Sequence, residues 1–193
     1  MLVRKMQFED IEACARLMAE SPLWQRYGVS EASAARRFEG GLAQQEQIAV
    51  AEVDAKAAGF IWYSARGAFN LSGYVMLIGV AAEQRSRGVG RALMDHAEGA
   101  LFRETQDIFL LVSDFNEDAQ RFYQRLGYRP VGAIPDYILP GVAELIYHKR
   151  DPNRCAASRF YPAKTSRPTG QPSNPWRQPC RTACEKSSRR PCS

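Results

Sequence analysis

Near the middle of the chain the sequence runs Arg85-Ser86-Arg87-Gly88-Val89-Gly90-Arg91-Ala92-Leu93. The apolar run before it, Tyr74 to Val80, is short enough for a buried strand, and apolar residues recur at helical spacing after it. The two glycines let the chain turn tightly and let a ligand approach the backbone without meeting a Cβ atom. Because the first N–H groups of a helix have no partner inside it and lie at the positive end of its dipole, this turn predicts a phosphate-binding site.

Two other kinds of phosphate loop do not fit this turn. It lacks the Gly-Lys-Ser/Thr ending of a nucleoside triphosphatase and the three-glycine fingerprint of a dinucleotide-binding fold. Taken alone, the turn also suits an ordinary connection between a strand and a helix, so its function depends on the rest of the chain.

A second pattern follows downstream. The run from Ile108 predicts a buried strand, and residues 117–126 predict a short helix with an apolar face. Asn116 suits the N-cap of this helix and Gly127 suits its C-terminal stop. The local sequence leaves two roles open for Asn116, a helix cap or a ligand contact, and two for Tyr123, a core aromatic or a reactive hydroxyl.

Together these patterns resemble the GNAT superfamily, the Gcn5-related N-acetyltransferases. The glycine turn is similar to their Arg/Gln-x-x-Gly-x-Gly/Ala motif, and Asn116 and Tyr123 lie seven positions apart, as in the ribosomal-protein alanine N-acetyltransferases. The resemblance covers residues 1–150. It implies a mixed α/β fold, with a mostly antiparallel, splayed central sheet flanked by helices. Gly79 suits a local bulge in the strand beside the splay.

The resemblance also implies a function, an acetyl-CoA-dependent N-acetyltransferase that moves an acetyl group to a primary amine by direct attack. In this family the turn holds the pyrophosphate of acetyl-CoA, a backbone N–H of the preceding strand stabilises the oxyanion, and the Asn contacts the pantetheine arm. The implied catalytic residue is Tyr123, whose hydroxyl would protonate the leaving thiolate. The implied cofactor-binding residues are Ile78, Gly79, Val80, Ser86, Arg87, Gly88, Val89, Gly90, Arg91 and Asn116.

The sequence departs from the family pattern at the general base. The alanine N-acetyltransferases carry a Glu five residues before the Asn, and that position here is Leu111. Either water relays the proton from the amine, or another carboxylate serves, for which Asp114, Asp136 and Glu144 are candidates. The acceptor amine stays open. Six residues lie in or near the segments that shape the acceptor site in this fold: Trp24, Tyr27, Trp62, Phe69, Asp136 and Tyr137. They suit ordinary packing as well as they suit binding of an amine, so we assign them no role.

The remaining pattern predicts the order strand, two helices, three strands, helix, strand, helix, two strands. Strands are expected at 2–6, 48–53, 59–63, 74–80, from 108, at 129–131 and at 144–147. Helices are expected at 8–19, 31–43, from 89 to 101 and at 117–126. Ser30 is expected to cap the second helix, and Ser21-Pro22 to break the first.

Composition divides the chain near residue 150. Residues 151–193 hold nine Lys or Arg and two Asp or Glu, whereas residues 1–150 hold 17 and 19, so the basic charge belongs to the tail. The tail has seven of the eleven prolines and no Val, Ile, Leu or Met. Such a segment buries too little apolar surface to offset the entropy of ordering, so we predict a domain at 1–150 and a disordered tail at 151–193. Two alternatives for the tail stay open. It is either a basic arm that contacts nucleic acid or acidic lipid, or an accidental extension of the chain.

The cysteines indicate neither a disulfide framework nor a metal site. Their total is odd, and the pair Cys180 and Cys184 has no second ligand pair at a plausible spacing. Cys14 is expected to be a small core residue, and His96 and His148 to be structural or exposed. The other tail cysteines are Cys155 and Cys192.

No apolar run is long enough to span a bilayer, and the N-terminal residues suit a strand rather than a targeting segment. We therefore expect a cytoplasmic protein with no membrane partner. Two other functions compete with acetyl transfer: a non-catalytic acetyl-CoA-binding sensor, and a nucleic-acid-associated protein that uses its basic tail. The sequence leaves the oligomeric state open, and a homodimer is one option because sheet-edge dimers are common among GNAT proteins.

Overall fold

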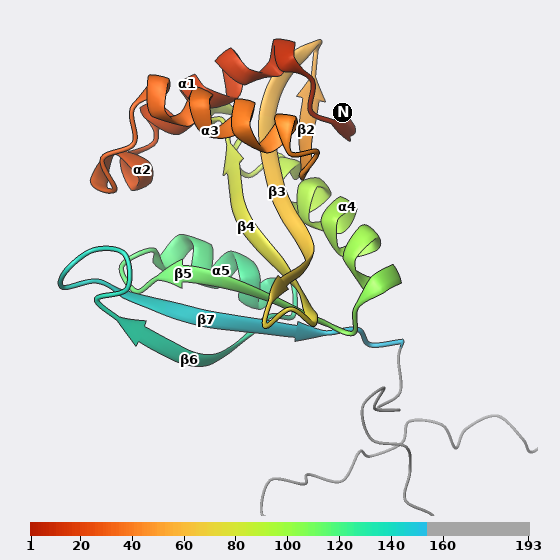
Figure 1. Cartoon of the computed structure of the whole chain (residues 1–193), viewed down its shortest axis with the longest axis vertical. Helices are drawn as coiled ribbons and strands as arrows, with labels where there is room; N and C mark the ends of the chain where they lie inside the picture. The colour runs from red at the N-terminus through yellow and green to blue at the C-terminus, as the bar shows by residue number, and fades with distance from the viewer. Residues whose placement is uncertain (154–193) are drawn as a thin grey trace, which may run out of the picture. The chain divides into compact units, whose positions relative to one another are not determined.

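The computed structural model describes residues 1–153. Seven strands of this part form one sheet, in the order β1-β2-β3-β4-β5-β7-β6 (Figure 1). The strands are β1 (Leu2–Lys5), β2 (Gln47–Val53), β3 (Lys56–Ala68), β4 (Ser72–Val80), β5 (Asp107–Ser113), β6 (Arg129–Pro135) and β7 (Ala143–Arg150). The helices are α1 (Ile11–Glu20), α2 (Pro22–Arg26), α3 (Glu31–Ala43), α4 (Val89–Glu104) and α5 (Glu117–Arg125), with 3-10 turns η1 (Phe8–Asp10) and η2 (Ala82–Gln84).

Helices cover both faces of the sheet. In β2, Ile48 and Val50 pack with α1, α2 and α3, whereas Ala49 and Ala51 pack with α4 on the opposite face. This division follows from the alternation of side chains along a strand. All neighbouring strands are antiparallel except β4 and β5, so the predicted mixed, mostly antiparallel class is confirmed.

The sheet splays between β4 and β5, as predicted. The two strands pair in parallel only from Gly73 with Ile108 to Val75 with Leu110, and then separate (Figure 1). A β-bulge lies at the point of separation, where Trp62 and Tyr63 of β3 face Leu77 and Val75, so that Met76 is the extra residue. Bulges re-aim a strand, and this one turns β4 away from β5.

The bulge expected at Gly79 was therefore a wrong prediction. Gly79 pairs with Phe60 in regular register. A Cβ atom there would lie 2.7 Å from Phe60 Cε1, 2.7 Å from Trp24 Cη2 and 3.0 Å from Leu17 Cδ2. The missing side chain lets α1 and α2 pack closely on β4, which is a packing reason rather than a backbone one.

The element order agrees with the prediction, with two local differences. Ser21-Pro22 ends α1 but also begins α2, because proline fits the first position of a helix. Strand β3 is longer than predicted and begins at Lys56, since Asp54 and Ala55 alone make the turn at φ values of 50° and 59°. Helix α3 has the predicted bounds, and the Ser30 hydroxyl caps it by accepting from the Ser33 N–H at 3.2 Å.

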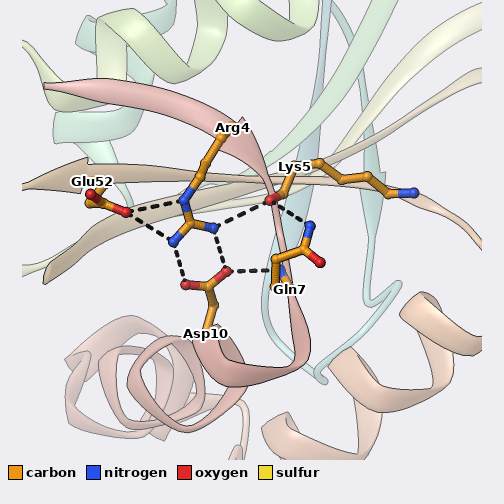
Figure 2. A network of polar contacts seen from close by, with 5 residues as sticks. All are labelled: Arg4, Lys5, Gln7, Asp10 and Glu52. Atoms are coloured by element: carbon orange, nitrogen blue, oxygen red, sulfur yellow. Dashed lines mark hydrogen bonds and ion pairs between the residues drawn. The ribbon is translucent and has the colours of Figure 1, made fainter. Parts of the chain in front are cut away.

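A closed network of charges fixes the N-terminal strand (Figure 2). Arg4 donates from two nitrogens to both carboxylate oxygens of Asp10, at 2.7 and 2.9 Å, and its Nε donates to Glu52 Oε2 at 3.1 Å. Asp10 Oδ2 also accepts the Gln7 N–H at 2.8 Å. These contacts tie β1 to β2 and to the start of α1. Cys14 is fully buried next to this network, as expected.

The described chain continues just past β7. Asp151 is buried, and its N–H donates to the Gln106 carbonyl at 2.9 Å. The predictions for the tail at 151–193, including its disorder and its four cysteines, fall from residue 154 onward outside the described residues. Within the described part, no helix combines the length and the apolar character needed to cross a membrane.

Candidate active site

The glycine turn leads into a helix whose first backbone N–H groups have no partner within the helix. Ser86 and Gly88 both have left-handed backbone, with φ values of 61° and 85°, and Gly88 is the N-cap of α4. The first hydrogen bond of the helix joins the Ala92 N–H to the Gly88 carbonyl at 3.0 Å, so the N–H groups of residues 89–91 have no partner within it. A Cβ atom at Gly88 would meet nothing within 4 Å. The turn is therefore an open cradle that fits a phosphate group.

Gly90 brings this cradle against the helix that carries Tyr123. A Cβ atom at Gly90 would lie 3.3 Å from Phe122 Cζ of α5 and 3.6 Å from Val80 Cγ2 at the end of β4. The first turn of α4, the end of β4 and α5 thus meet at one place. The two sequence patterns, more than twenty residues apart in the chain, are neighbours in the fold.

The end of β4 runs free on one side. Residues 76–80 lie beyond the last β4 residue that pairs with β5, while Ile78, Gly79 and Val80 keep their β3 partners. The backbone edge that faces the splay therefore has no strand partner over this stretch. Such an edge suits an extended ligand chain, and the predicted roles of these three residues in binding and oxyanion stabilisation stay predictions.

Tyr123 lies on α5, with its side chain 6% exposed. Its ring packs against Phe122, Tyr128 and Tyr147, with centroids 5.2, 5.9 and 6.3 Å away. Burial raises the pKa of Tyr123 well above its ordinary value, and the neighbouring Tyr74 adds to the shift. The phenol is therefore protonated at neutral pH, the state that a proton donor needs.

The Tyr123 hydroxyl is not used to hold the fold. Among the described residues, no hydrogen bond joins this hydroxyl to another group, although the ring is embedded in the core. The sequence left open whether Tyr123 is a core aromatic or a reactive residue. Its ring fills the core, and its hydroxyl is left for other contacts.

Asn116 is the cap of α5. Its Oδ1 accepts the Ala119 N–H at 3.3 Å, which confirms the capping role. The side-chain amide nitrogen makes no hydrogen bond to the described part of the chain, so the cap leaves a donor at the splay end of β5. The predicted contact with the pantetheine arm stays a prediction.

The structure separates the three candidate carboxylates. Asp114 Oδ2 accepts the Ala143 N–H at 3.1 Å, and Asp136 Oδ1 accepts the Gly141 N–H at 2.6 Å. Both are exposed, and both organise the loop between β6 and β7. Glu144 differs, because it is buried at 3% exposure and makes no such backbone contact.

Glu144 belongs to a cluster of hydroxyl groups. The Tyr27 hydroxyl, at the end of α2, donates to Glu144 Oε1 at 2.6 Å and lies 2.6 Å from Ser113 Oγ. Burial raises the pKa of Tyr27, and its hydrogen bond to Glu144 raises it further. Sequence reasoning left Tyr27 without a role and did not consider Ser113. The only sequence signal for Ser113 is a polar residue at the end of an apolar strand.

The aromatic residues considered for the acceptor site do not form one group. Trp24 stacks on Phe60, with centroids 5.6 Å apart, and Trp62 is buried under α3. Phe69 is 75% exposed in the β3–β4 turn, and Tyr137 is 59% exposed in the β6–β7 loop. Trp24 nevertheless matters for the site, because its packing on β4 holds the short helix α2, which Tyr27 directly follows.

Comparison with known proteins agrees with this geometry. Residues 8–128, more than half of the chain, match the Acetyltransferase (GNAT) family. An uncharacterized N-acetyltransferase of Methanocaldococcus jannaschii is 33% identical over 106 residues, which cover 54% of this chain and 66% of that relative. The chain thus spans slightly less than two thirds of this relative's length.

Solved structures share the fold. The ribosomal-protein-alanine N-acetyltransferase of Brucella melitensis has a TM-score of 0.64 at 18% identity, covering 78% of this chain and 99% of that one. An aminoglycoside 6'-N-acetyltransferase complexed with coenzyme A has a TM-score of 0.64 at 15% identity, covering 78% and 97%. With the splayed sheet, the glycine turn and the family match over residues 8–128, the chain belongs to the GNAT acetyltransferase family.

Proposed function

We propose that this protein transfers the acetyl group of acetyl-CoA to a primary amine by direct attack. The splay between β4 and β5 is the observation that carries the proposal. It leaves a free backbone edge that starts at the bulge and leads to the cradle of unpaired N–H groups at α4. A coenzyme with a long extended arm and a pyrophosphate suits such a combination, and a relative in fold is complexed with coenzyme A.

In this proposal residues 86–91 hold the pyrophosphate through backbone N–H groups and the positive end of α4. Ile78, Gly79 and Val80 bind the pantetheine arm along the free edge of β4, and one of their N–H groups donates to the oxyanion. Asn116 contributes its amide nitrogen to the arm. Acetyl-CoA itself supplies an acetyl group activated as a thioester.

The protein positions the reaction and supplies a proton. The amine nitrogen attacks the carbonyl carbon, the carbon–sulfur bond breaks, and the electron pair goes to sulfur. Tyr123 then gives its proton to the thiolate, for which its protonated state at neutral pH is the required one. Holding both reactants in the splay makes the attack effectively intramolecular.

Calorimetric titration with acetyl-CoA tests the binding site. The full chain should bind, and Gly88→Glu should weaken binding by at least about tenfold, because a carboxylate would face the pyrophosphate. Gly141→Glu is the matched control, since Gly141 also has left-handed backbone at φ 76° with nothing within 4 Å of a Cβ atom. Absence of binding by the folded wild type would end the proposal.

The reaction is tested with a panel of primary amines, and release of the CoA thiol is the readout. Tyr123→Phe should lower kcat by about 100-fold or more at unchanged acetyl-CoA affinity. Tyr147→Phe is the control, because Tyr147 lies in the same core and its hydroxyl already accepts from Gln124 Nε2 at 3.2 Å. An amine acetylated at a rate that depends on Tyr123 would also exclude the non-catalytic sensor.

Three further proposals accompany this function: an acetyltransferase domain at 1–150, a cytoplasmic location and a homodimeric state. The comparisons give no support to the sensor or to a nucleic-acid-associated role. The acceptor in this proposal is a small-molecule or peptide amine.

A further inference from the structure

The cluster of Tyr27, Ser113 and Glu144 joins three distant parts of the chain. Tyr27 follows α2, Ser113 ends β5 and Glu144 lies near the start of β7, where it pairs with Ser113 in the sheet. Two 2.6 Å contacts run from Ser113 Oγ through the Tyr27 hydroxyl to Glu144 Oε1. The partly exposed Tyr27 hydroxyl is the middle of this chain, and the short contact lets a proton pass from it to the buried Glu144.

Glu144 differs from the buried carboxylate of Asp10, which is paired with Arg4. Within residues 1–153 no Lys, Arg or His nitrogen lies within ion-pair distance of it, although it is only 3% exposed. A buried carboxylate without a cation is costly unless it is hydrogen-bonded, and among the described residues the Tyr27 hydroxyl is the side-chain group that donates to it.

The cluster lies on the opposite face of the sheet from Tyr123. Side chains alternate along β5, where Ile108, Leu110 and Val112 pack in the core shared with Tyr123, so Ser113 points to the other face. Glu144 is on that other face too, because Leu145 packs on the Tyr123 side. Ser113 lies beyond the last β5 residue that pairs with β4, and Tyr74 of β4 interacts electrostatically with both Glu144 and Tyr123, so the cluster and Tyr123 both lie near the splayed part of the sheet.

We propose that Glu144 is the proton acceptor of the acetyl-transfer reaction and that the Tyr27 hydroxyl conducts the proton to it from the amine. The inference rests on the proposed function and supplies the base that the sequence lacks at Leu111. Tyr27 is the group that meets the amine, since its side chain is partly exposed and Glu144 is enclosed. Glu144 acts through Tyr27.

The protons balance as follows. The ammonium gives one proton to the Tyr27 oxygen while Tyr27 gives its own to Glu144 Oε1, which later releases it to solvent. The neutral amine attacks, and the carbon–nitrogen bond forms. The second proton leaves the nitrogen as the carbon–sulfur bond breaks, and it replaces the proton that Tyr123 gives to sulfur.

Several titratable and charged groups surround this path, and a pH profile must take account of them. Arg26 lies beside Tyr27 on α2 and opposes the rise of its pKa. On β4, burial raises the pKa of Tyr74, with further contributions from Tyr137 of the β6–β7 loop and from Glu144, while Arg37 of α3 opposes the rise. Tyr74 in turn contributes to the raised pKa of Tyr123.

A purely structural role for Glu144 makes a different prediction. If Glu144 only anchored Tyr27, then Glu144→Gln would keep the anchor, because the amide oxygen can accept the same hydroxyl. If Glu144 takes the proton, the same substitution removes the acceptor. Glu144→Gln therefore separates the two roles better than a truncation to alanine.

The experiment measures acetyl-CoA affinity and kcat for an amine substrate from pH 6.5 to 10 in full-length variants. Glu144→Gln should keep the affinity and lower kcat by about 100-fold near pH 7. The deficit should shrink as the pH approaches the pKa of the amine, because free amine then needs no acceptor. Tyr27→Phe should give a similar loss, and the double variant should be no worse than either single one.

Asp136→Asn serves as the matched carboxylate control. Its amide oxygen can still accept the Gly141 N–H, so kcat and its pH profile should follow the wild type. The proposal is overturned if the wild type acetylates an amine and Glu144→Gln keeps its rate and pH profile. If the wild type binds acetyl-CoA but acetylates no amine, the proposed function fails, and this inference fails with it.

Discussion

Two buried carboxylates in this protein have opposite surroundings. Asp10 is 8% exposed and receives two nitrogens of Arg4 and one backbone N–H. Glu144 is 3% exposed, and among the described residues its carboxylate receives a hydrogen bond only from the Tyr27 hydroxyl. The first carboxylate is neutralised and fixed by its partners. The second has no ion pair within residues 1–153, and we infer that it is kept for chemistry.

The two sites are also assembled differently. The Arg4–Asp10 contact spans six residues and closes as soon as β1 meets the turn before α1 (Figure 2). The Tyr27–Glu144 contact spans 117 residues and needs the complete sheet, with β7 between β5 and β6. Charge attraction holds the first site together, whereas packing of Trp24 on β4 places the hydroxyl of the second.

The largest effect is expected from removing the cation of the closed network. Arg4→Met should lower the free energy of unfolding by about 3 kcal/mol, because it leaves Asp10 buried without its partner. Lys5→Met is the control, since the Lys5 side chain is exposed and only its carbonyl accepts from Arg4. Urea unfolding measures both variants. Equal effects would mean that the network is not what fixes β1.

A smaller loss of stability is expected at the Tyr27–Glu144 site, which packing rather than charge supports. Gly79→Ala places a methyl group 2.7 Å from two aromatic rings, so we expect a loss of about 2 kcal/mol as α2 shifts. Acetyl transfer should fall more than acetyl-CoA affinity, because Tyr27 shifts with α2. Gly99→Ala in α4, with nothing within 4 Å, should instead stabilise the protein by about 0.5–1 kcal/mol. A stable, fully active Gly79→Ala variant would contradict the role of Trp24.

The next smaller effect is the loss of stability on removing the Asp10 charge, and this loss depends on pH. Burial alone raises the pKa of Asp10, but the hydrogen bonds from Arg4 and the Gln7 N–H outweigh it and hold the pKa below its usual range. Because the folded pKa is depressed, the stabilisation is present above the unfolded pKa of about 3.9 and disappears as the pH falls through the folded value. Asp10→Asn should therefore cost about 1.5 kcal/mol at pH 7.

This cost should shrink below about pH 4, where the wild-type carboxylate takes up a proton during unfolding. Chemical unfolding of the wild type and Asp10→Asn at pH 7, 5 and 3 measures the gap. The amide can still accept one of the original hydrogen bonds, which is why the loss is smaller than for Arg4→Met. A gap that stays constant with pH would show that the charge of Asp10 does not matter.

Local features of the site could be predicted from the sequence. The glycine turn, the Ser30 cap and the Asn116 cap each depend on a few neighbouring residues, and the structure places all three as expected. Short helices and irregularities in strand pairing were harder to predict from the sequence. Ser21-Pro22 was interpreted only as a break, and the bulge was assigned to Gly79 rather than Met76, because a glycine in a strand has packing as well as backbone explanations.

The choice among three carboxylates could not be made from the sequence. Asp114, Asp136 and Glu144 all lie near the last two strands, and nothing local distinguishes them. Their hydrogen bonds distinguish them in the structure, since two accept loop N–H groups and the third accepts a phenol. That phenol belongs to a segment more than 100 residues earlier, and its position depends on the topology of the whole sheet.

The smallest effect on stability is expected at Glu144 itself. Glu144→Gln removes a buried charge that has no cation and keeps an oxygen for the Tyr27 hydroxyl, so the free energy of unfolding should change by less than about 1 kcal/mol. Tyr27→Phe should cost more, about 1–2 kcal/mol, because it removes the hydroxyl that donates to the buried carboxylate. Urea unfolding at pH 7 compares the two. A loss at Glu144→Gln as large as that at Asp10→Asn would place Glu144 among the structural carboxylates, and the contrast between the two sites would then be one of sequence distance only.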